Sequence, residues 1–250
     1  GLATRQGEVS TFSVKPNGYT GSTVCSPKGA TATLKIGMLF PMYSLDGTEH
    51  VYSSSGHNNM VGALMAIEEI NANLDLLPNT KLTYEVYDTK HDPGTIIPNT
   101  FYLATDSFNG KGADVVVGGA YSGPTIASHN VLKSFGTPQM SYSATSPLLS
   151  DTKEYPYFLR TVPSDAFQGK AIAQFLKDDL EYTNVCVVHG DDAYNANLAA
   201  AFIYSSLELG ITVVKTIETN VKPTNKQAAD YIAVLKQAAC RVVFLSLHSG

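Results

Sequence analysis

Two spacings of hydrophobic residues alternate along this chain. Short apolar runs predict buried strands, and apolar residues three or four positions apart predict helices. Residues 34–40 form such a run, and Met60, Leu64 and Ile67 mark one face of a helix over residues 58–74. Further strands are predicted over residues 82–87, 114–117, 184–189, 211–217 and 241–247. One more predicted strand ends near residue 141. Further helices are predicted over residues 165–178, 195–209 and 226–239. Two more predicted helices end near residues 108 and 135.

This alternation predicts an α/β protein with doubly wound parallel sheets. The alternation of predicted helices and strands begins again after Pro163, so we expect two lobes joined by a hinge. Residues 1–31 lack a sustained period and are expected to form a flexible N-terminal leader. Lobe 1 is predicted to span residues 32–160 and the first part of lobe 2 residues 161–250. Because lobe 2 shows few strands, we expect it to be truncated at residue 250.

Composition and charge narrow the classes of function. The chain has 250 residues, 44% hydrophobic and 16% charged, with a formal net charge of −5. No basic patch stands out, which argues against nucleic acid as a partner. No apolar run reaches the roughly 18 residues that a membrane span needs. Of the three cysteines, Cys186 and Cys240 lie in apolar runs and are predicted to be buried thiols.

Catalytic and metal-binding patterns are missing from the sequence. There is no G-x-S-x-G, Walker, H-E-x-x-H or G-x-G-x-x-G motif. The histidines and cysteines show no metal-ligand spacing, and no cofactor motif occurs. Asp191 and Asp192 are adjacent carboxylates, which is typical of a solvated loop or helix start. We therefore expect a protein that is not an enzyme.

Polar residues after the predicted strands are the candidate site, because ligands of open α/β sheets bind at the carboxyl ends of strands. Ser122 lies at a helix start, where backbone N–H groups favour an anion, although ordinary capping explains the same residue. Ser143 and Thr145 follow the next strand, and their hydroxyls can donate and accept. A turn ended by Pro147 is the alternative for that stretch.

The second predicted lobe adds two further candidates. Asp165, three residues before Gln168, reads as a capping box or as a carboxylate that binds an ammonium group. Tyr194 lies in the loop that begins at Gly190, after a predicted strand. It is interpreted either as an aromatic lid that closes over a ligand or as a side chain that packs within the loop.

Several stretches of the sequence resemble one receptor family. Residues 141–165 read SYSATSPLLSDTKEYPYFLRTVPSD, and LFPMYS, IEEINAN and YDTKHDPG occur earlier. These motifs resemble the ligand-binding (Venus-flytrap) domain of class C G-protein-coupled receptors, of the metabotropic glutamate and GABA-B-like kinds. The resemblance runs from Leu34 to Gly250 and implies the type I periplasmic-binding fold.

The resemblance also implies roles for the candidate residues. By motif, Ser122 and the segment Ser143, Ala144 and Thr145 would bind an amino acid's carboxylate, with Thr145 and Asp165 at its ammonium. Tyr194 would close the site.

At the ligand's far end, the resemblance places Ser55 and Asn59 where glutamate receptors have groups that bind the distal carboxylate. Neither is cationic, so glutamate is disfavoured. Asp165 replaces a non-acidic residue of the GABA-type members, which favours a ligand with a free α-amino group.

The implied function is that of the extracellular ligand-binding domain of a membrane receptor. It would bind a small amino-acid-like ligand in an inter-lobe cleft at the outer face of the plasma membrane. Lobe closure would signal to a G protein through a membrane region outside this chain. A dimer through lobe 1 is possible, with helices 58–74 and 123–135 as candidates. A solute-binding protein of an amino-acid ABC transporter, periplasmic or secreted, and the ectodomain of a single-span receptor cyclase or kinase remain alternatives.

Overall fold

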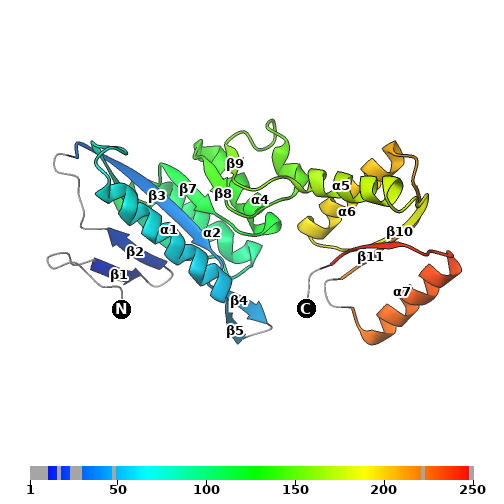
Figure 1. The fold of residues 1–250 in the computed structure, drawn as a ribbon. Coiled ribbons are helices and arrows are strands. Elements are labelled where there is room, and N and C mark those ends of the chain that lie inside the picture. Colours follow the sequence, from blue (N-terminus) through cyan, green and yellow to red (C-terminus); the bar gives the residue numbers. More distant parts are fainter. Residues whose placement is uncertain (1–10, 16–17, 23–29, 47–48, 221–222, 248–250) are drawn as a thin grey trace. The chain divides into compact units, whose positions relative to one another are not determined.

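The protein folds into two compact units (Figure 1). The computed structural model describes residues 11–15, 18–22, 30–46, 49–220 and 223–247. The first unit comprises residues 1–144 and 155–161, and the second comprises residues 145–154 and 162–250. The short segment 145–154 therefore leaves the first unit and packs with the second before the chain returns for β9.

A seven-stranded sheet forms the centre of the first unit. Its strand order is β1-β2-β6-β3-β7-β8-β9, and the five strands from β6 to β9 are parallel. The strands are β1 (Thr11–Lys15), β2 (Gly18–Ser22), β3 (Ala32–Phe40), β6 (Thr80–Asp88), β7 (Val115–Gly118), β8 (Gln139–Ser141) and β9 (Phe158–Arg160). A separate antiparallel pair joins β4 (Tyr43–Asp46) to β5 (Glu49–Tyr52).

Helices connect the parallel strands of this sheet. They are α1 (Ser54–Ala72), α2 (Pro93–Thr105), α3 (Ser107–Gly110), α4 (Ser122–Leu132) and the 3₁₀ turn η1 (Lys133–Phe135). The periodic sequence predicted α1, α2 and α4 within a few residues of these bounds.

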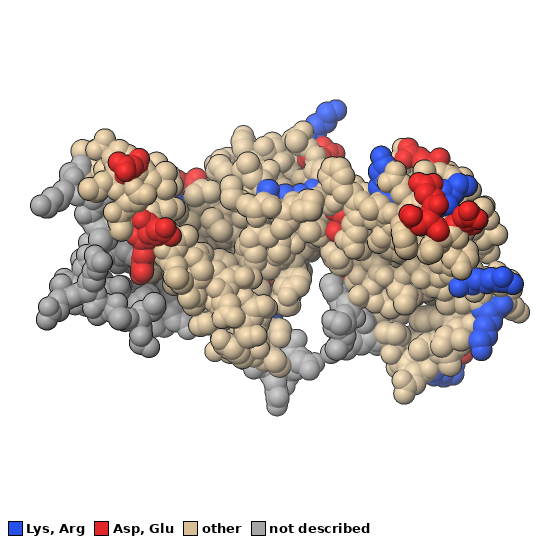
Figure 2. Space-filling view, viewed as in Figure 1, with Lys and Arg blue, Asp and Glu red and all other residues tan. Residues whose placement is uncertain are grey.

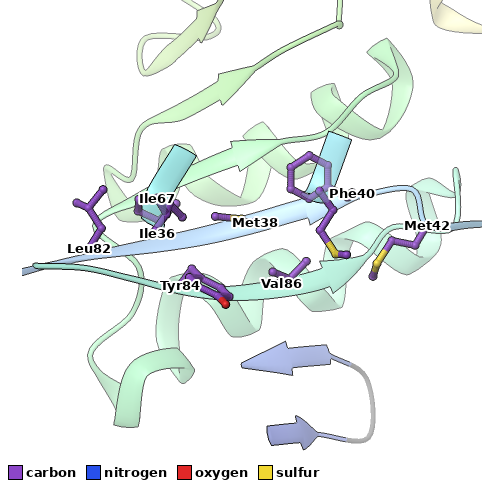
Figure 3. Close-up of a cluster of buried hydrophobic side chains, with 9 residues drawn as sticks. Ile36, Met38, Phe40, Met42, Ile67, Leu82, Tyr84 and Val86 are labelled. Atoms are coloured by element: carbon purple, nitrogen blue, oxygen red, sulfur yellow. The ribbon is translucent and has the colours of Figure 1, made fainter. Parts of the chain in front are cut away.

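Apolar side chains on both faces of the sheet make this unit doubly wound. Met38 and Val86 belong to a cluster with α1, which Figure 3 shows in part. Their neighbours Leu39 and Tyr87 point to the opposite face and pack with α2 and α4. Successive residues of a strand face opposite sides, so a strand buried on both faces is apolar along most of its length. The continuous apolar run of β3 meets that requirement.

The N-terminal segment differs from the expected flexible leader. Residues 11–15 and 18–22 are strands, and β2 pairs antiparallel with β6. The dipeptide Asn17-Gly18 is a common hairpin signal and could have indicated the pair. The other residues up to 29 lie outside the described part of the chain.

The second unit carries a three-stranded parallel sheet of order β11-β10-β12. The strands are β10 (Asn184–Gly190), β11 (Thr212–Thr219) and β12 (Val243–Ser246). Its helices are α5 (Asp165–Asp178), α6 (Ala193–Glu208), α7 (Asn225–Gln237) and the 3₁₀ turn η2 (Pro147–Ser150). The core of this unit lies among α5, α6 and the sheet, with Phe202 stacked on Phe244. The mixed α/β architecture with parallel sheets agrees with the predicted fold class.

Cys186 and Cys240 are not the two buried thiols that the sequence predicted. They form a disulfide between β10 and the segment after α7, with their Cα atoms 5.9 Å apart. That separation lies in the usual range for disulfides. The sequence pattern missed the pair because the two cysteines are 54 positions apart and only the parallel pairing of β10 with β12 brings them together.

No helix among the described residues has both the length and the apolar character needed to cross a bilayer.

Candidate functional site

Two loops at the carboxyl ends of β7 and β8 are tied together by serine hydroxyls. The Ser141 hydroxyl donates to the Gly119 carbonyl oxygen at 2.7 Å, and the Ser143 hydroxyl donates to the Ala120 carbonyl oxygen at 2.7 Å. Ser141 Oγ in turn accepts from the backbone N–H of Ala144 at 2.9 Å. The structure therefore fixes the predicted residues Ser143 and Ala144 against the loop that leads into α4.

Ser122 lies at the start of α4, as predicted, but it is not the capping residue. Tyr121 occupies the N-cap position, and Ser122 is the first helical residue, with 3% of its surface exposed. The first N–H groups of a helix have no partner inside it. A helix start of this kind favours an anion through its dipole.

Asn59, a predicted contact for the ligand's far end, lies near the same strand ends. Burial raises the pKa of Tyr142 well above its ordinary value, and a hydrogen bond with the Asn59 side chain partly lowers it. The Tyr142 ring stacks on Phe40 at 5.4 Å between centroids. Ser55 is exposed one turn earlier on α1 and lies 3.3 Å from the N-cap hydroxyl of Ser53.

Two aromatic residues that the sequence analysis did not assign to the site lie beside it. The rings of His91 and Tyr121 are 3.9 Å apart between centroids. Tyr121 also raises the pKa of Tyr142, after burial as the main cause. The signal that could have found them is their position in the loops after β6 and β7, at the same edge of the sheet as Ser143.

In the second unit, Asp165 is buried at the first position of α5. Only 4% of it is exposed, and its backbone N–H donates to the Thr145 carbonyl oxygen at 2.9 Å. The predicted capping box is wrong: Ser164 is the N-cap residue and accepts from the backbone N–H of Ala166. The predicted bounds of this helix, residues 165–178, are those of α5, and only the capping residue was placed one position late, because Ser164 and Asp165 are both good capping residues.

Tyr194 lies near Asp165 in the same unit. Burial raises the pKa of the Tyr194 hydroxyl, and the carboxylates of Asp165 and then Asp192 raise it further. Asp192 caps α6 by accepting from the backbone N–H groups of Tyr194 and Asn195, at 3.0 and 3.2 Å. Asp192 is thus the helix start that the adjacent carboxylates predicted. Tyr194 stays protonated beside an acidic group, where it is a hydrogen-bond donor.

A buried polar network lies behind the first unit's loops and was not foreseen. The Gln139 amide donates to the Gly118 carbonyl oxygen at 2.8 Å and to Ser128 Oγ at 2.6 Å. His129, fully buried on α4, packs against the rings of Tyr155 and Phe158. Burial lowers the pKa of His129. Gln139 thus holds the carbonyl group of Gly118, the residue before the Gly119 carbonyl that Ser141 binds.

On the face that Figure 2 shows, Lys and Arg side chains are scattered and form no broad patch. Among the described residues, no group of three or more His, Cys, Asp or Glu side chains is arranged to bind a metal ion. What the candidate residues offer is therefore hydroxyl, amide and helix-terminal groups in the first unit, and one buried carboxylate in the second.

Comparison with known proteins identifies the family of the chain. Residues 59–250 match the family described as the receptor family ligand binding region. The chain belongs to this family.

Individual relatives are receptors. The chain is 25% identical over 228 residues to metabotropic glutamate receptor 4 of Macaca fascicularis, which covers 82% of this chain and 24% of that receptor. The same values hold for metabotropic glutamate receptor 4 of Rattus norvegicus. The extracellular calcium-sensing receptor of Homo sapiens is 31% identical over 157 residues, 57% of this chain and 14% of that receptor. The chain thus spans about a quarter of the length of the metabotropic relatives and a smaller part of the calcium-sensing receptor. These relatives confirm the resemblance of the chain to class C receptors.

Proposed function

We propose that this chain binds a small ligand with a free α-amino and α-carboxylate group, as part of a cell-surface receptor. The observation that carries the proposal is Asp165, a buried carboxylate at the start of α5 beside the Tyr194 hydroxyl. A carboxylate in a buried position forms a strong, charge-assisted hydrogen bond with an ammonium group.

The first unit supplies the complementary half of the proposed site. The start of α4 and the serine-tied loops favour an anion, because N–H groups and the helix dipole point at it. We propose that the ligand's carboxylate binds at the start of α4, at Ser122, in the frame that Ser143 and Ala144 form, and that its ammonium binds at Thr145 and Asp165. A ligand that contacts both units would favour a closed arrangement, since only differential affinity shifts such an equilibrium.

The proposed far end of the ligand is neutral. Asn59 and Ser55 offer amide and hydroxyl groups, and Tyr142 adds a protonated phenol. A second carboxylate on the ligand would have no cation among these side chains. We therefore propose a neutral amino acid rather than an acidic one.

The experiment is calorimetric titration of the protein with a panel of neutral, acidic and basic amino acids and with GABA. Neutral α-amino acids are expected to bind. In Asp165→Asn their affinity is expected to fall about 10- to 100-fold, because a charge-assisted hydrogen bond contributes roughly 1.5–3 kcal/mol.

Asp178→Asn is the matched control, because Asp178 is exposed at the other end of the same helix. It is expected to bind as the unmodified protein does. If no α-amino acid binds, or if the two Asn variants lose affinity equally, the proposed ligand class is wrong.

We further propose that signalling passes to a G protein through a membrane region outside this chain, at the outer face of the plasma membrane. The support is the likeness to metabotropic glutamate and calcium-sensing receptors. The Cys186–Cys240 disulfide adds support, since disulfides persist in oxidising compartments.

A further inference from the structure

An apolar pocket of about 150 Å³ lies in the first unit between α1, β6 and the segment after β3. Its lining side chains come from both sides of that gap: Met42, Tyr43, His57, Met60, Leu64, Tyr84 and Val86. Figure 3 shows three of them, with Tyr84 and Val86 on β6 and Met42 beyond the end of β3.

The walls of the pocket are fixed by the fold. His57, Met60 and Leu64 recur at helical spacing on one face of α1, and Tyr84 and Val86 point to the same face of β6. The segment after β3 is held by Asp88, whose Oδ1 accepts from the backbone N–H groups of Met42 and Tyr43 at 2.9 and 3.3 Å. The pocket is therefore formed before any ligand arrives.

Aromatic rings surround one side of this pocket. The ring of Tyr52, on β5, lies 5.9 Å from that of Tyr43 and 5.6 Å from that of His57, between centroids. Tyr43 and Tyr52 are 40% and 55% exposed. An edge with both apolar rings and polar tips suits a molecule that enters from water.

We propose that this pocket is a second ligand site, which binds a small uncharged aromatic molecule with one or two rings, such as a phenol or an indole. An enclosed apolar cavity of about 150 Å³ takes up a benzene-sized molecule, and this pocket, which is open at its aromatic edge, leaves room for one or two rings. Methionine side chains adapt to ring shapes and make favourable contacts between sulfur and aromatic rings. Met42 and Met60 supply two such contacts.

The lining chemistry separates this site from the proposed amino-acid site. Among the described residues, no Asp, Glu, Lys or Arg side chain lines the pocket, so a zwitterion would bury both of its charges without partners there. The hydroxyl of Tyr84, whose pKa is raised by burial and then by Glu68, stays protonated. Phenol and indole each bring at most one polar group, which this hydroxyl or His57 can match.

The experiment is a titration of the purified protein with indole, followed by indole fluorescence. The chain contains no Trp, so indole emission is not obscured by the protein's own. A saturable blue shift is expected as indole leaves water. Leu64→Phe fills the pocket and is expected to weaken indole binding by about tenfold or more, equivalent to roughly 1.4 kcal/mol.

Met65→Phe is the matched control, because Met65 is the next residue of α1 and is 55% exposed. It is expected to leave indole binding unchanged, as is Asp165→Asn. If Leu64→Phe does not fold, Val86→Ile adds one methylene group inside the same pocket and should also weaken binding. The proposal is overturned if indole binding does not saturate, if Leu64→Phe or Val86→Ile binds as well as the unmodified protein, or if Met65→Phe weakens it equally. Loss of indole binding in Asp165→Asn would equally overturn it, by assigning indole to the amino-acid site.

Discussion

The Ser143 hydroxyl hydrogen is directed at the Ala120 carbonyl oxygen, so toward a ligand this side chain acts through its lone pairs. The Ala144 N–H is likewise directed at Ser141. The start of α4 remains as a source of donors for a carboxylate in the first unit. At the scale of single residues, the serine-rich stretch builds the site's frame as much as its contact surface.

His129 predicts how stability depends on pH. Burial lowers its pKa in the folded protein, and Lys133 lowers it further, against a hydrogen bond with Gln139 that raises it. The unfolded chain, with a pKa of about 6.5, therefore binds more protons than the folded protein. The stability that neutral His129 contributes is complete above about pH 6.5 and is lost as the pH falls through the lower folded pKa.

Denaturant unfolding at a series of pH values checks this. His129→Phe removes the titrating group and should flatten the decline below about pH 6.5. A decline of the same steepness in the variant would contradict the assignment.

At the scale of elements, the position of Asp165 depends on how closely α5 packs on α6. A Cβ atom at Gly169 would lie 2.7 Å from the backbone nitrogen of Phe202 and 2.9 Å from the carbonyl carbon of Ala201. Only glycine permits this approach of the two helices. The helix that carries the buried carboxylate is thus held by backbone contact one turn after Asp165.

Gly169→Ala is expected to destabilise the protein by about 1–3 kcal/mol, because it overpacks the contact between α5 and α6. Gly62→Ala is the matched control on α1, where nothing lies within 4 Å of the added Cβ. It should stabilise the protein by roughly 0.5–1 kcal/mol through helix propensity. Chemical unfolding measures both, and equal effects of the same sign would contradict the packing argument.

Helix α7 depends on the disulfide more than the other long helices do. None of its residues is buried, and the chain after it is linked to β10 through Cys240 and Cys186. Local stability is low where few apolar contacts are buried. The covalent link therefore compensates for weak packing at this edge of the second unit.

At the scale of the whole molecule, the disulfide ties folding to the compartment. Cys240→Ser is expected to lower the free energy of unfolding by about 2–4 kcal/mol. Mass spectrometry of the unreduced protein should recover one peptide that links Cys186 to Cys240. Ser150→Ala, an exposed and chemically small change in the same unit, should leave stability within about 0.5 kcal/mol. Recovery of both cysteines as thiols would contradict the pairing.

A dimer through the first unit stays a prediction. The structure adds that exposed apolar residues of this unit include Ile97 and Phe101 on α2 and Phe135 at the end of η1, with the two phenylalanine rings 5.9 Å apart. Helix α2 is thus a further candidate for the dimer interface, in addition to the two helices that the sequence indicated.

Much of this fold could be predicted because a parallel strand that is buried on both faces appears in the sequence as a continuous apolar run. β3 and β10 are examples. The strand pair β1–β2 was not predicted because this part of the chain is rich in Gly and Ser and has no clear apolar pattern. Its position depends on the antiparallel pairing of β2 with β6. The disulfide and the Gln139 network escaped for the same reason, since both depend on contacts between residues distant along the chain.

Of the candidate site, the sequence placed Ser122, Ser143 and Asp165 at the ends of the right elements. It did not show which hydrogen bonds those residues already make. The structure supplied that for Ser143 and corrected the capping role of Asp165, because both facts depend on backbone geometry within a single turn.

The ties from Ser141 and Ser143 to the preceding loop also have a kinetic consequence. Both loops are ordered by these bonds before a ligand arrives, so little conformational entropy is lost there on binding. A pre-formed surface accepts its ligands at similar association rates, and affinity differences then appear mainly as residence times. Ligands of different affinity for this protein are accordingly expected to differ in how slowly they leave rather than in how fast they arrive.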